Sequence, residues 1–469
     1  MDSRDAETLS KTVFDVAIVG AGPAGAVTAL LCARAGLITL ILDRARFPRP
    51  KPCGDCLSPA LTRVLERLGL LQVVLDEDPA RLAGWRIVSP GGTAFQGRFD
   101  DISSDPRVHV ALAISRARLD AALLAQAERA GAQVLTNARV TAIEPASRSD
   151  ETGRITGRHH NQHFAVDARI IVGADGLRSV VARAIHAMRP RFRGLRKISL
   201  TAHVTGVHGA HPMGEMHLAE GLCVGIAPVN NCAAGMTNAR EMDLAAAGAA
   251  VSVCVHDGHL RWANGEGSVP EWNVTLVADA RRFGRSVARQ PETFFREALR
   301  RFPALDGRLD DIQPVGPHGS GRDPWLLRSG PFDMPTRRTV AGNVALVGDA
   351  AGYYDPFTGQ GIYQAVTGAE RLAQAIVAIV RGQVSRTIAL RRYARDLQRQ
   401  ARGPRFLQHA IETVLSRPDV ATNTVAWLAR RPGILNALLA ATGDLMPVGS
   451  LFKLTTLRAL VSATQRPTA

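Results

Sequence analysis

The chain has 469 residues, of which 46% are hydrophobic, and a formal net charge of +15 at pH 7. This length and composition predict two or three folded domains with a large buried core, which excludes a disordered or fibrous protein. Only four of the 57 basic residues are lysine, the arginines are scattered, and aromatic residues make up 5%. We therefore expect no nucleic-acid partner, because such binding needs clustered charge and stacking aromatics.

The first residues, Met1 to Lys11, are polar and lack the apolar segment of a secretory signal. No run of about 20 residues is free of glycine, proline and charge, as a membrane span requires. We expect a cytoplasmic protein without a disulfide framework or a metal site. The C-terminal tail pairs arginines with apolar stretches. A peripheral contact with the inner face of a membrane therefore stays open, although helices packed on the protein are the preferred interpretation.

The N-terminal pattern predicts one βαβ unit. An apolar, β-branched run at Val13–Val19 indicates a buried parallel strand, and a glycine-rich turn follows it. Ala26–Ala35 is predicted to be a helix capped by Gly36, and Leu37–Leu42 a second strand.

The rest of the chain alternates in the same way and then changes character. Helices are predicted at 57–68 and 118–130, and strands at 133–140 and 169–172. Strand patterns dominate the middle, at 198–207, 216–227 and 272–277, with a weakly patterned excursion over 230–271. A strand at 340–347, a helix at 362–380 and a basic helical tail over 391–460 complete the chain.

The glycine-rich turn has the form of a dinucleotide fingerprint, Gly20-x-Gly22-x-x-Gly25. It follows a strand, opens a helix, and lies 23 residues before Asp43 at the end of the next strand. Gly20 permits the turn, Gly22 lets the backbone approach a pyrophosphate, and Gly25 allows close packing. Asp43 would accept hydrogen bonds from a ribose. The motif alone fits NAD and FAD equally well, and a plain glycine turn is the less favoured alternative.

A second motif, Gly348-Asp349, follows an apolar strand and precedes a helix. Here the sequence resembles the superfamily of FAD-dependent monooxygenases and reductases with a p-hydroxybenzoate-hydroxylase-like fold. The resemblance implies that Asp349 binds the ribityl chain of FAD. It also implies that the loop 355–362 lies against the flavin ring. The implied contacts from this loop are Pro356, Gly359, Gly361 and Ile362.

Further motifs extend this resemblance. Gly173-Ala174-Asp175-Gly176 matches the superfamily's Asp-Gly motif, which supports the pyrophosphate region, and Arg116 matches an arginine that reaches the FAD phosphates or adenosine. The implied FAD-binding set is completed by Ala24 and Arg44.

A loop with the sequence Lys51-Pro52-Cys53-Gly54-Asp55-Cys56 resembles the geranylgeranyl reductase branch of the superfamily. The resemblance implies that Cys53 lies near the reaction centre, with Pro356 as a second candidate catalytic residue. A redox-active Cys53-x-x-Cys56 dithiol is disfavoured, because the pair does not follow a thioredoxin-type strand.

The implied fold is α/β: a Rossmann-type FAD-binding domain with an inserted α+β antiparallel-sheet substrate domain and a helical C-terminal tail. The predicted FAD-binding domain is discontinuous and comprises residues 12–85, 110–190 and 332–382. The substrate domain comprises 86–109 and 191–331, and the tail comprises 383–469.

Among the activities that this resemblance implies, an NAD(P)H-dependent monooxygenase is slightly favoured. It would hydroxylate or epoxidise a bulky apolar substrate, such as a polyketide, aromatic or isoprenoid, with O2 through a flavin C4a-hydroperoxide. NAD(P)H would be a transient reductant, since no second fingerprint exists. The alternative is a reductase of prenyl or lipid double bonds, with hydride from flavin N5. A flavin-dependent halogenase and an electron-transfer flavoprotein are further alternatives.

The resemblance also places bulky aromatics where this chain has Gly225 and Ala227, so we expect an open wall facing the flavin. This argues against a halogenase. So does the expectation that Lys51 is the only lysine near the site. No general base stands out, and His318 and Asp355 are the nearest polar candidates.

Overall fold

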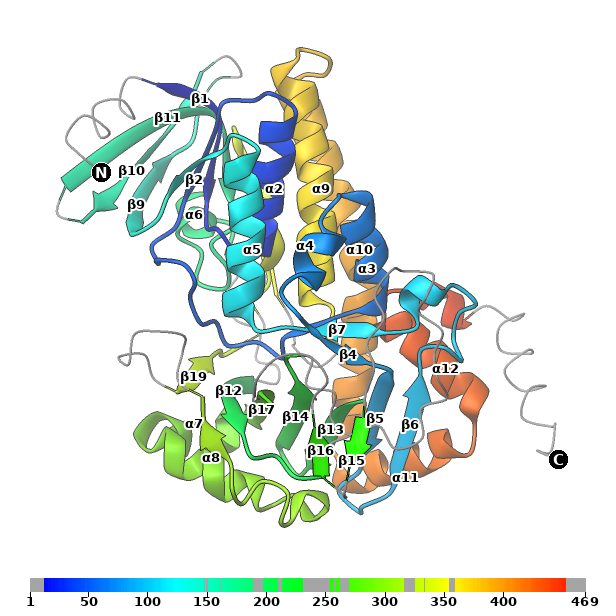
Figure 1. Cartoon of the computed structure of the whole chain (residues 1–469). Coiled ribbons are helices and arrows are strands. Elements are labelled where there is room, and N and C mark those ends of the chain that lie inside the picture. Colours follow the sequence, from blue (N-terminus) through cyan, green and yellow to red (C-terminus); the bar gives the residue numbers. More distant parts are fainter. Residues whose placement is uncertain are drawn as a thin grey trace.

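The computed structural model describes two packed bodies joined by a long C-terminal helix (Figure 1). It describes residues 12–146, 148, 151–160, 162–188, 197–209, 213–230, 254–256, 259–261, 270–315, 325–332, 334–353 and 359–452. The predicted excursion over 230–271 therefore lies largely outside the described residues. Pro356, Asp355 and His318 also lie outside them.

The first body contains a parallel sheet in the order β20-β21-β11-β1-β2-β8, with the edge strand β20 antiparallel to β21. Strand β1 lies at its centre, and its residues are buried on both sides: Ile18 belongs to one core and Phe14 to the other. Burial on both faces explains why this strand is an unbroken apolar run. The strands are β1 (Val13–Val19), β2 (Thr39–Leu42), β8 (Gln133–Leu135), β11 (Gln162–Gly173), β20 (Val340–Ala341) and β21 (Val344–Leu346).

Three helices cover one face of this sheet, and an antiparallel strand pair with a short helix covers the other (Figure 1). The helices of the first face are α2 (Pro23–Arg34), α5 (Arg116–Arg129) and α9 (Gly361–Val380). The opposite face carries β9 (Ala138–Glu144), β10 (Gly153–His159) and α6 (Val180–Ala184).

The second body is built on a sheet in the order β18-β12-β17-β14-β13-β5-β6, with β19 also paired to β12. All its pairs are antiparallel except β5 with β13, so the sheet is mixed. Helices α7 (Ala280–Arg289) and α8 (Pro291–Leu299) pack on one face through an apolar core. The strands are β5 (Gly84–Val88), β6 (Ala94–Arg98), β12 (Lys197–Thr205), β13 (Gly214–Ala219), β14 (Leu222–Pro228), β17 (Trp272–Asp279), β18 (Gln313–Pro314) and β19 (Leu326–Ser329).

The predicted helical tail is confirmed as α10 (Arg386–Leu415), α11 (Pro418–Ala429) and α12 (Pro432–Thr442). The last two helices pack on β5 and β6, where Leu435 and Leu439 join Phe95 in an apolar cluster. Gly97 of β6 has no room for a side chain, because a Cβ there would lie 1.8 Å from Leu439. Within the part of the chain that the structure describes, no helix has the length and apolar character needed to cross a membrane.

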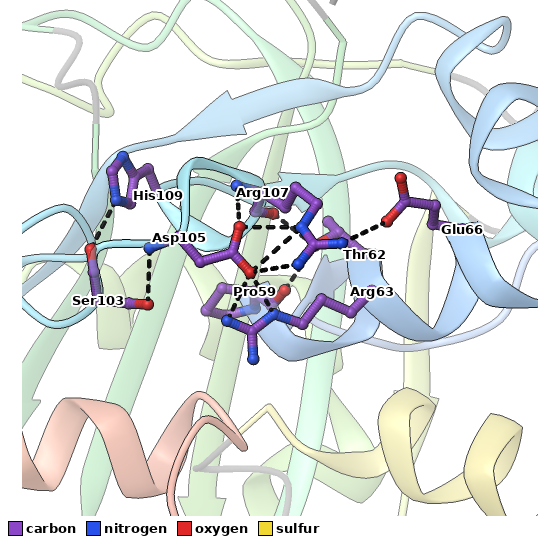
Figure 2. Close-up of polar contacts among 8 residues, drawn as sticks. All are labelled: Pro59, Thr62, Arg63, Glu66, Ser103, Asp105, Arg107 and His109. Atoms are coloured by element: carbon purple, nitrogen blue, oxygen red, sulfur yellow. Dashed lines mark hydrogen bonds and ion pairs between the residues drawn. The ribbon is translucent and has the colours of Figure 1, made fainter.

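A polar cluster anchors the segment that follows Cys53 (Figure 2). Asp105 accepts hydrogen bonds from Arg63 of α3 (Pro59–Arg67) and from Arg107 of a short 3-10 helix. The pKa of Asp105 is lowered, first by the hydrogen bond from Arg107. Thr62 donates to the Arg107 carbonyl oxygen at 2.7 Å. These contacts hold α3 and the loop 103–109 together.

Three segments that we predicted as single strands are each two strands in the structure. The strand predicted at 133–140 is two strands separated at Asn137, which has a left-handed φ of 56°. The strand predicted at 216–227 is the hairpin β13–β14, which turns at Gly221 with φ of 71°. The strand predicted at 340–347 is divided by a turn at Gly342. In each case one residue of positive φ interrupts an apolar pattern that continues on both sides of it.

Asn343 in this last turn is fully buried, and its side chain bonds three backbone groups. It accepts from the Ala146 amide at 2.8 Å and donates to the carbonyl oxygens of Ala168 and Arg169 at 3.1 Å each. We expect Asn343→Ala to lower the free energy of unfolding by about 2–5 kcal/mol, because it leaves these groups without partners. Urea denaturation measures the effect. Gln383→Ala, at an exposed position, is the control, and an equal effect of both changes would contradict the account.

Candidate functional site

A pocket lies between the two bodies. One wall is formed by the start of α2, the loop 51–56, Gly348–Asp349 and the residues 359–362 that begin α9. The other wall is the face of the second sheet that α7 and α8 do not cover, with contributions from β12, β14 and β17. The pocket therefore brings together segments that lie far apart in the sequence.

The glycine-rich turn is packed so tightly that side chains are excluded. A Cβ on Gly20, whose φ is +103°, would lie 2.4 Å from the Ala174 carbonyl oxygen. A Cβ on Gly25 would lie 1.8 Å from the Gly20 carbonyl oxygen. The geometry agrees with the predicted roles: Gly20 makes the turn, and Gly25 lets α2 approach it. Gly22 is the N-cap of α2, so the amide groups at this helix end face the pocket.

Three cationic side chains converge on the start of α2. The guanidinium groups of Arg116 and Arg49 each lie 3.7 Å from the position of a Cβ on Gly22, and Lys51 lies 3.6 Å from Asp349. Arg116 is buried and makes a bidentate pair with Asp120. Burial lowers the pKa of Lys51, and the charge of Arg116 adds to the effect. A helix N-terminus surrounded by cations is an anion-binding site, so this cradle fits a pyrophosphate.

Asp43 organises the turn directly. Its carboxylate accepts hydrogen bonds from the amides of Ala21 and Ala45, at 2.8 Å each. From the sequence we expected Asp43 to accept hydrogen bonds from the ribose alone. The structure shows that each carboxylate oxygen already has one backbone donor, which leaves a second lone pair on each. Arg44, the next residue, is exposed beyond the end of β2.

The Asp-Gly motif supports the turn from behind. The carboxylate of Asp175 accepts from the Ser179 hydroxyl and the Val180 amide, both at 2.6 Å, and so caps α6. Burial raises the pKa of Asp175. Gly176 lines the pocket, with φ of +75°, beside Lys51. The motif thus positions backbone atoms, and its carboxylate is already engaged within the protein.

The remaining predicted cofactor residues meet at the pocket. Gly348 has φ of +61°, and a Cβ there would lie 3.0 Å from the Cβ of Ala24. This close approach brings Asp349 next to the start of α2. Residues that line the same wall are Gly359, Gly361 and Ile362.

Cys53 lies where the two walls meet. Its thiol is hydrogen-bonded by the Arg116 side chain and by the Asp55 backbone N–H. Burial raises the pKa of Cys53 and outweighs the opposing effect of Arg116. Burial also raises the pKa of Cys56, which is a second free thiol in the pocket. Both side chains are therefore protonated at neutral pH.

A buried acid–imidazole pair beneath Cys53 was not predicted. His203 Nε2 lies 2.5 Å from Oδ2 of Asp55, and Asn273 donates to the same oxygen at 2.7 Å. Asp55 is fully buried and has a left-handed φ of 58°. One signal was available in the sequence: β12 places polar residues at every second position, including Ser199, Thr201 and His203, which indicates a polar sheet face.

The sheet wall is both polar and open. Ser199, Thr201 and Thr275 line the pocket, and the two threonine hydroxyls are 3.0 Å apart. A Cβ on Gly225 would meet nothing closer than 4.0 Å, which agrees with the predicted open wall. We expected Lys51 to be the only lysine near the site, and this was wrong. Lys197 also lines the pocket. Lys197 forms an ion pair with Glu412 of α10.

The C-terminal region holds the start of α9 through a buried carboxyl group. Gln360, the N-cap residue of α9, donates to the Asp444 carboxylate at 2.6 Å and to the Ala441 carbonyl oxygen at 3.2 Å. Burial raises the pKa of Asp444 to about 7, against the opposing hydrogen bond from Gln360. The folded protein therefore binds this proton more tightly than the unfolded chain does.

It follows that the free energy of unfolding falls as the pH rises from the ordinary pKa of a carboxyl group to about 7. The reason is that losing the proton is penalised only in the folded state. We expect Asp444→Asn, which keeps the acceptor oxygen, to raise the melting temperature above wild type at pH 8. The difference should shrink or reverse at pH 4. Differential scanning fluorimetry at both pH values measures it, and a difference that does not vary with pH would contradict the assignment.

Comparisons with known proteins agree with these features. The FAD binding domain family matches residues 13–238. Menaquinone reductase of Mycobacterium tuberculosis is 34% identical over 171 residues, 36% of this chain and 40% of that protein. Digeranylgeranylglycerophospholipid reductase 1 of Methanococcoides burtonii is 23% identical over 359 residues, 76% and 72% of the two chains. A protein of Methanosarcina barkeri from the nifH2 5′ region is 33% identical over 178 residues, 36% of this chain and 87% of that protein.

For the first relatives, among them the menaquinone reductase, the chain spans about two fifths of their length. Solved structures share the fold. The flavin-dependent halogenase CmlS superposes with a TM-score of 0.72 at 18% identity, covering 97% of this chain and 78% of that one. PqsL of Pseudomonas aeruginosa, a probable FAD-dependent monooxygenase, superposes with a TM-score of 0.63 at 20% identity, covering 88% and 99%. The chain thus belongs to the FAD-dependent oxidoreductase superfamily, and its cofactor is FAD.

Proposed function

We propose that this protein reduces a carbon–carbon double bond in a bulky, mainly apolar substrate such as a prenyl chain or a lipid quinone. The observation that carries the proposal is the protonated Cys53 thiol in the pocket between the FAD cradle and the substrate sheet. When bound, FAD supplies the hydride for such a reaction, and NAD(P)H is the proposed reductant that regenerates it.

The residues around the cradle fit FAD. We assign the pyrophosphate to the amides at the start of α2 together with Arg49, Lys51 and Arg116. The second lone pairs of Asp43 suit the adenosine ribose, and Asp349 suits the ribityl chain. Gly359 and Gly361 leave room for a flat ring at the wall that they form with Gly348.

Reduction of a double bond needs a proton as well as a hydride, and Cys53 is a protonated group that lines the pocket. Its raised pKa keeps the thiol protonated before reaction. Its two hydrogen-bond donors, Arg116 and the Asp55 amide, would stabilise the thiolate that remains after the proton has left. Burial outweighs these donors, so the thiol is protonated before the step, while the donors reduce the cost of the thiolate that remains after it.

The substrate sheet suits a large molecule with a polar part. Gly225 leaves open space, and Trp85, Met216 and Val277 supply apolar surface. Ser199, Thr201 and Thr275 offer hydroxyl groups on the same face. The relatives named as reductases of menaquinone and of a digeranylgeranyl lipid act on substrates of this description, which supports the proposal.

A monooxygenase is the second candidate, and the protonated thiols are compatible with it as well. Because burial keeps Cys53 and Cys56 protonated, both thiols would resist oxidation beside an O2-reactive flavin. In that case the open wall at Gly225 would admit the substrate to be hydroxylated or epoxidised.

The role of Cys53 is tested with holoenzyme reduced under anaerobic conditions and mixed with menaquinone or geranylgeranyl diphosphate as probes. We expect Cys53→Ala to slow flavin reoxidation by the accepted probe about 10²–10⁴-fold, because the acid is lost. Cys223→Ala, which changes another thiol of the pocket, should retain the wild-type rate. Equal rates in wild type and Cys53→Ala would exclude Cys53 as the acid. Reoxidation that requires O2 would favour the monooxygenase.

The open wall is tested separately. Gly225→Leu places an isobutyl group where the structure has open space, so we expect the KM for the accepted probe to rise on the order of tenfold or more. FAD content, measured from the absorbance ratio of flavin to protein, should not change. Gly225→Ala is the matched control with a small effect. An unchanged KM in Gly225→Leu would show that the substrate does not use this wall.

A further inference from the structure

Four hydrogen bonds attach the Cys53 loop to the substrate sheet, and all of them end on Cys53 or Asp55. Asn273 donates to the Cys53 carbonyl oxygen and to Asp55, at 2.7 Å each. Thr275 donates to the Cys53 carbonyl oxygen at 3.3 Å, and His203 contacts Asp55 at 2.5 Å. These are contacts between the two bodies, because the loop belongs to the first and His203, Asn273 and Thr275 belong to the second.

Only one of these attachments can change its charge near neutral pH. His203 lies between two carboxylates, with Nε2 at 2.5 Å from Asp55 and Nδ1 at 3.7 Å from Glu271. Burial lowers the pKa of His203, but the charges of Asp55 and Glu271 and the bond to Asp55 outweigh it, so the net direction is upward. The other titratable groups around the pair are Cys53, Cys56 and Arg116.

Asp55 shows that this arrangement is maintained at a cost. It is fully buried, its backbone is left-handed, and its Oδ1 has no hydrogen-bond partner among the residues that the structure describes. A buried carboxylate in a conformation unfavourable for most side chains persists when surrounding contacts compensate for it. The compensating contacts are those of His203 and Asn273 with Oδ2.

We propose that Asp55 and His203 are positioning residues: their ion pair holds the Cys53 loop against the substrate sheet and so sets the position of the Cys53 thiol in the pocket. When His203 loses its proton at higher pH, the buried Asp55 carboxylate loses its counter-charge, and the loop is held less firmly. Cys53 then moves more freely, although no residue that contacts the thiol has changed.

This inference rests on the proposed role of Cys53 in reduction, but its test does not need a substrate. The rate at which iodoacetamide alkylates Cys53 in the holoenzyme is measured by peptide mass spectrometry between pH 6 and pH 9. The variants are His203→Gln and Asp55→Asn. Asparagine keeps an acceptor oxygen and tolerates the left-handed backbone. His208→Gln, which breaks an exposed pair with Asp311, is the matched control.

At pH 6 we expect Cys53 to react about tenfold faster in His203→Gln and Asp55→Asn than in wild type. The ratio should fall toward one as the pH rises through the pKa of wild-type His203. Comparing rates at the same pH removes the increase in thiolate that pH itself produces. Because the Asp55 charge also raises the pKa of Cys53, each rate is divided by the thiolate fraction measured for that variant by pH titration. Alkylation of buried Cys32 reports general unfolding. If alkylation of Cys32 rises in His203→Gln, that variant is partly unfolded. The inference is then judged from Asp55→Asn and wild type alone.

Variant and wild-type rates that agree at pH 6, or a ratio that is the same at all pH values, would overturn the inference. A protein that reduces no double bond but shows the expected ratio would disprove the proposed function and leave the positioning role intact. Loss of reduction activity in both variants, with kcat falling and KM unchanged, would connect the two.

Discussion

The site depends on the close approach of three backbone segments, each of which has a glycine at the point of contact. Gly20 lies against Ala174, Gly25 against Gly20, and Gly348 against Ala24. At these distances a single added Cβ would force the segments apart. The amide groups at the start of α2, the Asp-Gly turn and the Gly348–Asp349 turn share one wall only because this space is kept. The FAD cradle is therefore a consequence of backbone packing, and the charged residues act on a frame that the glycines define.

Charges then give this frame its chemistry. Arg49, Lys51 and Arg116 supply positive charge at the start of α2, and Asp120 orients both arginines. Arg116 has a second function, because it also contacts the Cys53 thiol. One guanidinium group thus connects the anion-binding part of the pocket with its proposed acid. The second body contributes the opposite wall, and the C-terminal helices reach the site through Gln360–Asp444 and Lys197–Glu412.

Motifs that depend on local backbone geometry could be predicted from the sequence. The βαβ unit, the fingerprint glycines and the Gly348–Asp349 turn lie where their spacing indicated. The pair Asp55–His203 could not be predicted, because 148 residues separate its members and only the packing of two bodies brings them together. Strand breaks at Asn137 and Gly342 were missed for a different reason: a single positive φ leaves the apolar pattern unchanged. The contact of Lys197 with the pocket likewise depends on tertiary structure.

We propose that the protein adds hydrogen to a double bond and does not add oxygen to its substrate. The most direct test is one anaerobic turnover of reduced holoenzyme in D2O with an accepted prenyl or quinone probe, followed by mass spectrometry of the product. We expect one double bond to be saturated and no oxygen to be added, with deuterium at both new positions, because the Cys53 thiol and the hydride position of reduced FAD both exchange with D2O. A probe that is unchanged without O2, and that gains one oxygen atom when O2 is admitted, would contradict it.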